Sequence, residues 1–171
     1  TLAAARGVDY VLLCLGENSY CEKPGDLEDM YLSENQERLA TELAKTGKPI
    51  ILVLTQGRPR VISKIEPLVS AVLYAYLPGN HGEDAIADII YGDVNPSGKL
   101  PITYPRFPNS LIPYDHKYTE ALDDDGSLYK SHFAPQYEFG DGLSYTTFSY
   151  ENLKLSKSEI GPNDVLEVSI D

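Results

Sequence analysis

The residues Val8-Asp9-Tyr10-Val11-Leu12-Leu13-Cys14-Leu15 form a nearly continuous apolar run, which Gly16 ends. Runs of this kind are typical of strands that are buried on both faces in a parallel sheet. We therefore predict a parallel strand over residues 8–15, with Cys14 as a buried free thiol. The chain has only one other cysteine, Cys21, so a disulfide framework or a zinc site built on cysteines is not indicated.

The segments on either side of this run follow the order of an α/β fold. A helix begins where Ser33-Glu34-Asn35-Gln36 matches a capping box. The other expected elements are a helix end at 1–6, apolar runs at 49–55 and 70–76, and a short helix at 83–91. Strands that alternate with helices predict an open, mostly parallel sheet with helices packed against it, an α/β sandwich.

Ligands of open parallel sheets bind beyond the carboxyl ends of the strands. Three loops leave those ends, at 16–32, 55–61 and 77–82. The first loop is rich in carboxylates: Glu17, Glu22, Asp26, Glu28 and Asp29. Their position makes them candidates for a site, and solvated loop charges are the alternative that the residues alone leave open.

The character of the chain changes after Gly92. Residues 93–142 are rich in proline and without periodicity, which predicts a long irregular segment. Its acidic stretch 123–126 lacks the ligand pattern of an EF-hand, so we interpret it as a solvated turn. From Leu143 onward, spaced apolar residues predict short strands. We divide the chain into an α/β domain at 1–146 and the beginning of a β domain at 147–171, and expect both to belong to a longer polypeptide.

Composition and charge exclude several classes of function. The chain carries 14 Lys and Arg against 26 Asp and Glu, a net charge of −12, which disfavours binding to nucleic acids and to anionic membranes. No apolar run has the length of a membrane span. The histidines His81, His116 and His132 are scattered without the spacing of metal ligands, so we assign no metal.

Three generic motifs do not hold. Residues 92–99 resemble a phosphate-binding loop, but the spacing is one residue too long and Pro96 removes an amide donor. No G-x-G-x-x-G follows a strand, so we assign no nucleotide cofactor. Residues 142–146 lack the last glycine of a nucleophile elbow, which speaks against a serine hydrolase.

Several short motifs do occur in a fixed order along residues 8–148. They are Gly16-Glu17-Asn18, Tyr20-Cys21-Glu22-Lys23-Pro24-Gly25-Asp26, Thr46-Gly47-Lys48-Pro49, Gly57-Arg58-Pro59, Asn95-Pro96-Ser97-Gly98-Lys99-Leu100-Pro101 and Gly142-Leu143-Ser144-Tyr145-Thr146-Thr147-Phe148. Taken together they resemble the family 3 glycoside hydrolases of the β-glucosidase type. An ordered series of this length is far more specific than any single motif.

This resemblance implies a fold, an activity and a site. It implies a barrel-like first domain that carries a nucleophilic aspartate, this α/β sandwich as the second domain, and a fibronectin-type-III-like domain that begins near residue 147. The activity is the retaining hydrolysis of terminal β-linked sugars, and the general acid/base carries over onto Glu22, with Glu17 as the alternative. Asn18 and Tyr20 are candidates for contacts to the aglycone.

The same resemblance implies a carbohydrate substrate and the rest of the same polypeptide as partners, no cofactor, and a periplasmic or secreted location. The isolated chain should be inactive, because one of the two required carboxylates lies on the barrel. Two other functions stay open at this point: a noncatalytic sugar-binding or structural α/β module, and a flavodoxin-like nucleotide binder, against which the missing glycine motifs speak. Arg58 either binds a carboxylate or supports the loop.

Overall fold

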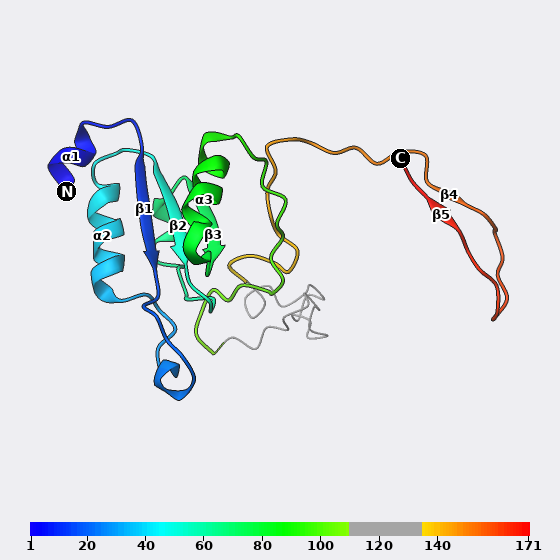
Figure 1. The fold of residues 1–171 in the computed structure, drawn as a ribbon, viewed down its shortest axis with the longest axis horizontal. Helices are drawn as coiled ribbons and strands as arrows, with labels where there is room; N and C mark the ends of the chain where they lie inside the picture. Colours follow the sequence, from blue (N-terminus) through cyan, green and yellow to red (C-terminus); the bar gives the residue numbers. More distant parts are fainter. Residues whose placement is uncertain (110–134) are drawn as a thin grey trace, which may run out of the picture.

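A computed structural model describes residues 1–109 and 135–171 of the chain. Figure 1 shows the elements in order: α1 (Leu2–Arg6), β1 (Val11–Gly16), η1 (Lys23–Gly25), α2 (Glu34–Ala44), β2 (Ile50–Thr55), η2 (Glu66–Leu68), β3 (Ala71–Tyr76), η3 (Gly79–His81), α3 (Gly82–Tyr91), β4 (Lys154–Leu155) and β5 (Val168–Ser169). The predicted acidic turn 123–126, His116 and His132 lie outside the described residues.

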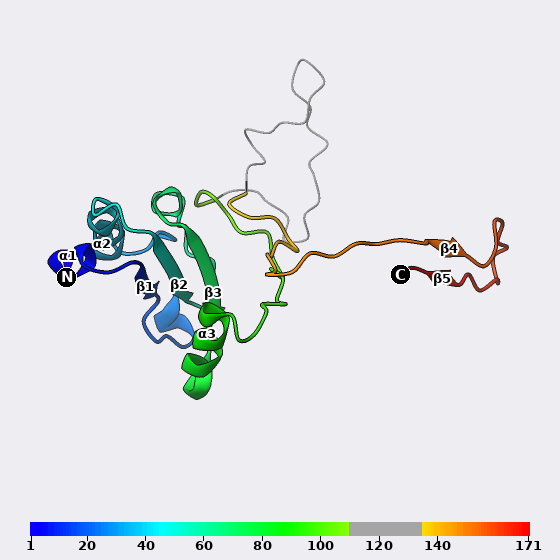
Figure 2. The ribbon, with the colours of Figure 1, turned by 90° about the horizontal axis from the view of Figure 1, so that it is seen from above.

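The first three strands form one parallel sheet in the order β1-β2-β3. In its register Val11 lies opposite Ile50, and Gly16 lies opposite Thr55, so β1 and β2 end level with each other. Helix α2 connects β1 to β2, and Figure 2 shows α2 and α3 on opposite sides of the sheet. The predicted parallel α/β sheet is therefore confirmed, and the loops that follow β1, β2 and β3 leave from the same edge.

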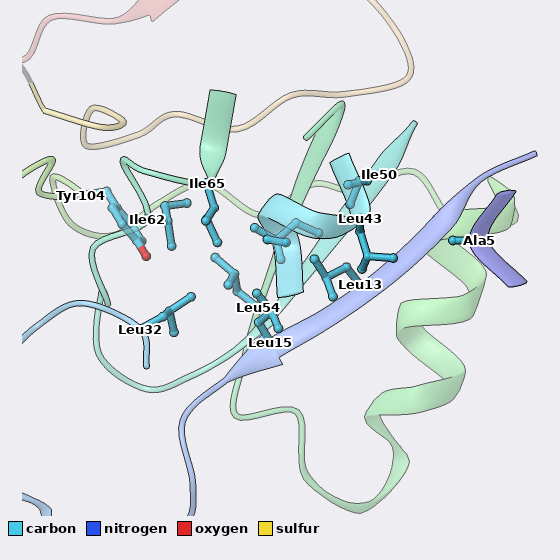
Figure 3. Close-up of a cluster of buried hydrophobic side chains, with 12 residues drawn as sticks. Ala5, Leu13, Leu15, Leu32, Leu43, Ile50, Leu54, Ile62, Ile65 and Tyr104 are labelled. Atoms are coloured by element: carbon cyan, nitrogen blue, oxygen red, sulfur yellow. The ribbon is translucent and has the colours of Figure 1, made fainter. Parts of the chain in front are cut away.

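The hydrophobic core lies on the face of the sheet that α2 covers, and Figure 3 shows its buried side chains. Alternate residues of β2 point into it, and Ile50, Leu52 and Leu54 are at most 1% exposed. Leu13 and Leu15 of β1 and Ala40 and Leu43 of α2 complete its centre. Full burial of each large aliphatic side chain stabilises the fold by about 1.5–3 kcal/mol, so this layer fixes the strand ends that carry the loops.

Strand β1 differs from its prediction. It begins at Val11 rather than at Val8, and its burial alternates, with Leu12 53% exposed and Cys14 exposed. The expectations of burial on both faces and of a buried thiol at Cys14 are therefore wrong for the described residues. The reason is position: β1 is an edge strand of this sheet, and α3 lies beside β3, so only the α2 side of β1 is covered (Figure 2).

The start of α2 also differs from the predicted capping box. Ser33 is the N-cap residue, as predicted, but its side chain makes no capping hydrogen bond. Gln36 reaches instead to the end of β1, where its Oε1 accepts from the Gly16 N–H at 2.9 Å and its Nε2 donates to the Gly16 carbonyl at 3.0 Å. The amide of Gln36 thus satisfies both backbone groups at the point where the strand ends.

Two described parts of the irregular segment are joined by backbone hydrogen bonds at Leu100 and at Tyr104. The Tyr104 N–H donates to the Tyr137 carbonyl at 2.9 Å, and the Tyr104 side chain is fully buried. Its hydroxyl accepts a hydrogen bond from Gln56 Nε2 at 2.8 Å and donates one to the Arg60 carbonyl at 2.5 Å. Tyr104 therefore fixes the backbone that follows β2.

Residues beyond Phe148 form a narrow antiparallel hairpin of β4 and β5, apart from the sheet in both views (Figures 1 and 2). The predicted turn is present at 161–164, where the Gly161 N–H donates to Asp164 Oδ2 at 2.9 Å. Large apolar side chains along the hairpin are exposed: Phe148 71%, Tyr150 76% and Val165 80%. Short strands were expected here, and a fibronectin-type-III-like domain stays a prediction.

Candidate functional site

The candidate site is the loop 17–33, which leaves the carboxyl end of β1. At its base Gly16 touches the end of β2, and a Cβ at this position would lie 2.7 Å from the carbonyl carbon of Thr55 and closer still to its oxygen. Only glycine fits this close approach. The Glu17 N–H continues the contact by donating to the Thr55 carbonyl at 3.1 Å. The loop is therefore fixed in direction from its first residue.

Glu17 is the first carboxylate of the loop and its main anchor. Its side chain is only 3% exposed and pairs with two arginines that follow β2. Arg58 approaches Oε1 through Nη2 at 2.9 Å and Nε at 3.0 Å, and Arg60 approaches the same oxygen through Nη1 at 3.3 Å. The backbone N–H groups of Gly57 and Arg58 donate to Oε2 at 3.2 and 3.3 Å.

These contacts set the protonation of Glu17. Burial is the largest single influence and raises the pKa of this carboxyl group. Hydrogen bonds from the backbone and side chain of Arg58, a hydrogen bond from Arg60 and the charge of Arg58 together outweigh burial, so the pKa lies below its usual value. Glu17 is therefore a carboxylate at neutral pH.

Arg58 holds the loop at two further points. Its Nη1 donates to the Gly25 carbonyl, and its guanidinium lies over the ring of Tyr20, 3.9 Å from the centroid. Such cation–π contacts are favourable by about 0.5–1 kcal/mol when exposed and more when desolvated. The two alternatives for Arg58 are thus both realised, because it binds the Glu17 carboxylate and supports the loop.

Arg60 holds the far end of the loop. Its Nε donates to the Met30 carbonyl at 3.1 Å, and its Nη2 donates to the Tyr31 carbonyl. The Val61 N–H also donates to the Met30 carbonyl, at 2.8 Å. Arg60 was not predicted from the sequence, although a second arginine in the loop that follows β2, opposite an acidic loop, is a signal that could have indicated it.

Tyr20 lies between two glycines. A Cβ on Gly25 would come within 2.8 Å of the Tyr20 ring, and a Cβ on Gly57 would collide with its hydroxyl. Tyr20 is 38% exposed, so one part of the ring is buried by the glycines and by Arg58 while another part faces solvent. The ring packs the first half of the loop against the loop that follows β2.

Glu22 lies at the tip, between these anchors. It precedes the short turn η1, and its carbonyl accepts from the Gly25 N–H at 2.8 Å. Its backbone has φ 50° and ψ −144°, a conformation that side chains rarely adopt and that costs about 1–3 kcal/mol. The residue is exposed, and its carboxylate has no hydrogen-bond or ion-pair partner within residues 1–109 and 135–171.

Several other polar residues at this edge of the sheet are not part of this network. Asn18 and Cys21 are exposed in the loop. His81 and Glu83 lie after β3, in η3 and in the first turn of α3, and both are exposed. The structure thus joins Glu17 and Tyr20 through Arg58, and leaves Asn18 and Glu22 at the surface.

The described ranges hold neither a cluster of metal ligands nor a membrane-spanning helix. Within 1–109 and 135–171, no three or more His, Cys, Asp or Glu side chains gather as metal ligands do. Among the helices of these same ranges, none has both the length and the apolar character needed to cross a bilayer.

Comparison with known proteins identifies the family. The family model described as the glycosyl hydrolase family 3 C-terminal domain matches residues 1–145. The lysosomal beta glucosidase of Dictyostelium discoideum is 44% identical over 154 residues, which are 89% of this chain and 18% of that protein. The periplasmic beta-glucosidase of Salmonella typhimurium is 33% identical over 98% of this chain and 23% of its own length.

The solved structure of a β-glucosidase from Erythrobacter marinus has the same fold. It superposes with a TM-score of 0.81 at 36% identity, covering 99% of this chain and 23% of that protein. The chain thus spans about a fifth of the length of the curated relatives it matches. With a matching family model over residues 1–145 and an α/β fold shared with a β-glucosidase, the chain belongs to glycosyl hydrolase family 3.

Proposed function

We propose that this chain supplies the general acid/base of a retaining glycosidase that hydrolyses terminal β-linked sugars, and that Glu22 is this residue. One observation carries the proposal: at the tip of an anchored loop, Glu22 has a strained backbone conformation and an exposed carboxylate that pairs with no group in residues 1–109 and 135–171. Residues held in sparsely populated conformations gather at functional sites. The carboxyl edge of a parallel sheet is where α/β proteins bind ligands.

The contrast with Glu17 supports the choice. A general acid has to hold a proton near the working pH and has to reach the departing oxygen. Glu17 is buried and its pKa is lowered, because Arg58 and Arg60 hold its carboxylate. It is suited to anchor the loop, whereas Glu22 is free to approach a substrate.

The proposed reaction uses two carboxyl groups about 5–5.5 Å apart. The first is the nucleophile, an aspartate on a barrel domain outside this chain, which attacks the anomeric carbon while Glu22 protonates the glycosidic oxygen. The aglycone then leaves as an alcohol. In the second step the Glu22 carboxylate takes a proton from water, whose oxygen attacks the anomeric carbon and displaces the aspartate, so the sugar keeps its β configuration.

We further propose that residues 1–146 form part of the α/β sandwich domain and that residues 147–171 begin a fibronectin-type-III-like domain. The exposed apolar side chains of the hairpin favour a β layer that covers them. The proposed substrates are β-glucosides, because the relatives named above are β-glucosidases. A periplasmic or secreted location accords with the periplasmic relative.

The test is Glu22→Gln in the whole enzyme, in which this chain is joined to the barrel. Hydrolysis of alkyl glucosides should fall by roughly 10²–10⁴-fold, the usual contribution of general acid–base catalysis. Dinitrophenyl glucosides need little protonation, so their first step should persist and a covalent intermediate should accumulate. Azide needs no general base, and it should restore turnover and yield a β-glycosyl azide.

Glu28→Gln is the matched control, since Glu28 is an exposed carboxylate of the same loop. It should change neither the leaving-group dependence nor the response to azide. If Glu22→Gln behaves like Glu28→Gln while Glu17→Gln shows both effects, Glu17 is the acid/base. If none of the three shows them, the chain is a noncatalytic module. The isolated 171-residue chain should show no turnover, because it lacks the nucleophile.

A further inference from the structure

Arg58 contacts the loop on both sides of Glu22. Its guanidinium binds the Glu17 carboxylate and lies over the Tyr20 ring, both of which precede Glu22 in the chain. It also donates to the Gly25 carbonyl, which follows Glu22. Arg58 itself lies three residues beyond the end of β2, whose side chains form the centre of the core. The Arg58 side chain, which extends from a backbone fixed by the core, therefore contacts the segment that carries Glu22 on both sides.

Arg60 offers a direct comparison. It binds the same Glu17 oxygen, and its other donors reach the Met30 and Tyr31 carbonyls at the far end of the loop. Among the contacts described for Arg60, none lies next to Glu22 in the chain. Arg58 and Arg60 thus share one carboxylate but hold different parts of the loop.

The tip of the loop, which carries Glu22, needs a contact that holds it in place. The backbone of Glu22 has a positive φ that an unrestrained chain would leave, and the side chain of Glu22 makes no described contact that holds it. The turn at η1 is closed by the Gly25 N–H to Glu22 carbonyl bond, and Arg58 fixes the carbonyl of the same Gly25. Movement of Arg58 would therefore release the turn that sets the conformation of Glu22.

We infer that Arg58 is a positioning residue for proton transfer: by tying Glu17, Tyr20 and Gly25 together it holds Glu22 where it can protonate the leaving group. The inference rests on the proposed role of Glu22. Arg58 acts through the loop and not on the sugar, because its charge is already paired with Glu17. Displacement of a catalytic group by about 1 Å can cost roughly 10²-fold in rate, so a loosened loop has a kinetic effect even in a folded enzyme.

The guanidinium is suited to this task in a way that an ammonium is not. It is planar, donates in several fixed directions and stacks on aromatic rings, whereas lysine is a flexible point charge. In Arg58→Lys the ion pair with Glu17 should persist, while the stacking on Tyr20 and the bond to the Gly25 carbonyl should be lost together. This variant separates positioning from charge pairing.

The experiment compares Arg58→Lys and Arg58→Gln with Arg60→Gln in the whole enzyme. The readout is kcat/KM for an alkyl β-glucoside and for dinitrophenyl β-glucoside. In both Arg58 variants kcat/KM for the alkyl substrate should fall roughly 10- to 100-fold. For the dinitrophenyl substrate kcat/KM should stay within about threefold of the wild-type value, because this leaving group needs little protonation. Arg60→Gln should lower the thermal midpoint and leave the ratio of the two values unchanged.

A double-mutant cycle adds a second readout. In a Glu22→Gln background, Arg58→Gln should change the alkyl rate by no more than about twofold, because the group that it positions is already absent. The inference would be overturned if either Arg58 variant lowered kcat/KM equally for both substrates. It would also be overturned if the effects of Arg58→Gln and Glu22→Gln on the alkyl rate were additive. If Glu22→Gln itself shows no leaving-group dependence, the proposed function fails. If Glu22→Gln shows it and the Arg58 variants do not, only the positioning role fails.

Discussion

Replacing Glu17 with glutamine should loosen the whole loop 17–33 without unfolding the sheet. In the wild-type chain the carboxylate receives side-chain donors from Arg58 and Arg60 and two backbone donors. A glutamine oxygen can keep the backbone donors, but its amide N–H groups would face the guanidinium groups, which also only donate. The substitution therefore leaves two cations near the loop without their partner.

The size of this effect follows from the burial. Removal of one member of a buried ion pair costs about 3–5 kcal/mol. The side chains of Arg58 and Arg60 are 28% and 14% exposed, so water partly replaces the lost carboxylate. We expect a local loss of about 2–3 kcal/mol, which corresponds to roughly 30- to 150-fold faster amide exchange where exchange proceeds by local opening.

Hydrogen–deuterium exchange read out on peptides that cover 17–31 and 56–61 measures this loss. Glu42→Gln is the matched control, because Glu42 forms an exposed pair with Lys45 on α2 that should contribute at most about 0.5 kcal/mol. The reasoning would be refuted if Glu17→Gln accelerated exchange no more than Glu42→Gln does.

The same ion pairs should make protection of the loop from amide exchange depend on pH. The pKa of Glu17 is lowered in the folded chain from its usual value of 4.5, so its stabilising effect is complete above about that pH. The effect is lost as the pH falls through the lower, folded pKa. Protection of the wild-type loop, corrected for intrinsic exchange rates, should therefore decline below pH 4.5, whereas the loop of Glu17→Gln should show no such decline.

Two further predictions concern the sheet and the core. Gly16→Ala should lower stability by about 3 kcal/mol or more, because its Cβ would collide with the Thr55 backbone; Gly98→Ala, where nothing lies within 4 Å, should leave the urea midpoint nearly unchanged. Burial raises the pKa values of Tyr74 and Tyr137 to about 12, so the stability that their neutral forms provide is complete below pH 10 and is lost as the pH rises toward 12. The phenolate absorbance of these two residues is the difference between the wild type and the Tyr74→Phe and Tyr137→Phe variants, and it should rise together with loss of the far-ultraviolet signal of the sheet. Earlier ionisation of either tyrosine, with the sheet still folded, would contradict its burial.

The local pattern of the sequence was enough to predict the architecture near the site. Strand and helix order, the parallel sheet and the loops at its carboxyl edge all follow from apolar runs and glycine boundaries. The burial of β1 did not follow, because an apolar run reports what a strand can bury and not how many neighbours it has. Leu12 and Cys14 are exposed since β1 is an edge strand of this sheet.

Contacts between residues far apart in the sequence also could not be predicted from the sequence pattern. The motif around Gln36 was interpreted as a capping box, but its amide binds Gly16 at the end of β1, a pairing that depends on the three-dimensional approach of α2. Glu17 and Glu22 were equivalent as carboxylates of one loop. The family resemblance placed the acid/base on Glu22 with Glu17 as the alternative, but it gave no physical contrast between them. The folded arrangement supplies that contrast, because it places Arg58 and Arg60 against Glu17.

The way in which the two arginines hold the loop also bears on how its sequence can diverge. Apart from Glu17 and the Tyr20 ring, their described loop partners are the main-chain carbonyls of Gly25, Met30 and Tyr31. A carbonyl is present whatever side chain a residue carries, so exchange of side chains at 26–29 leaves these bonds available. Substitutions at 26–29 can therefore change the preference for an aglycone while the acid/base keeps its position. New substrate specificities can arise in this part of the loop without loss of the contacts that hold it.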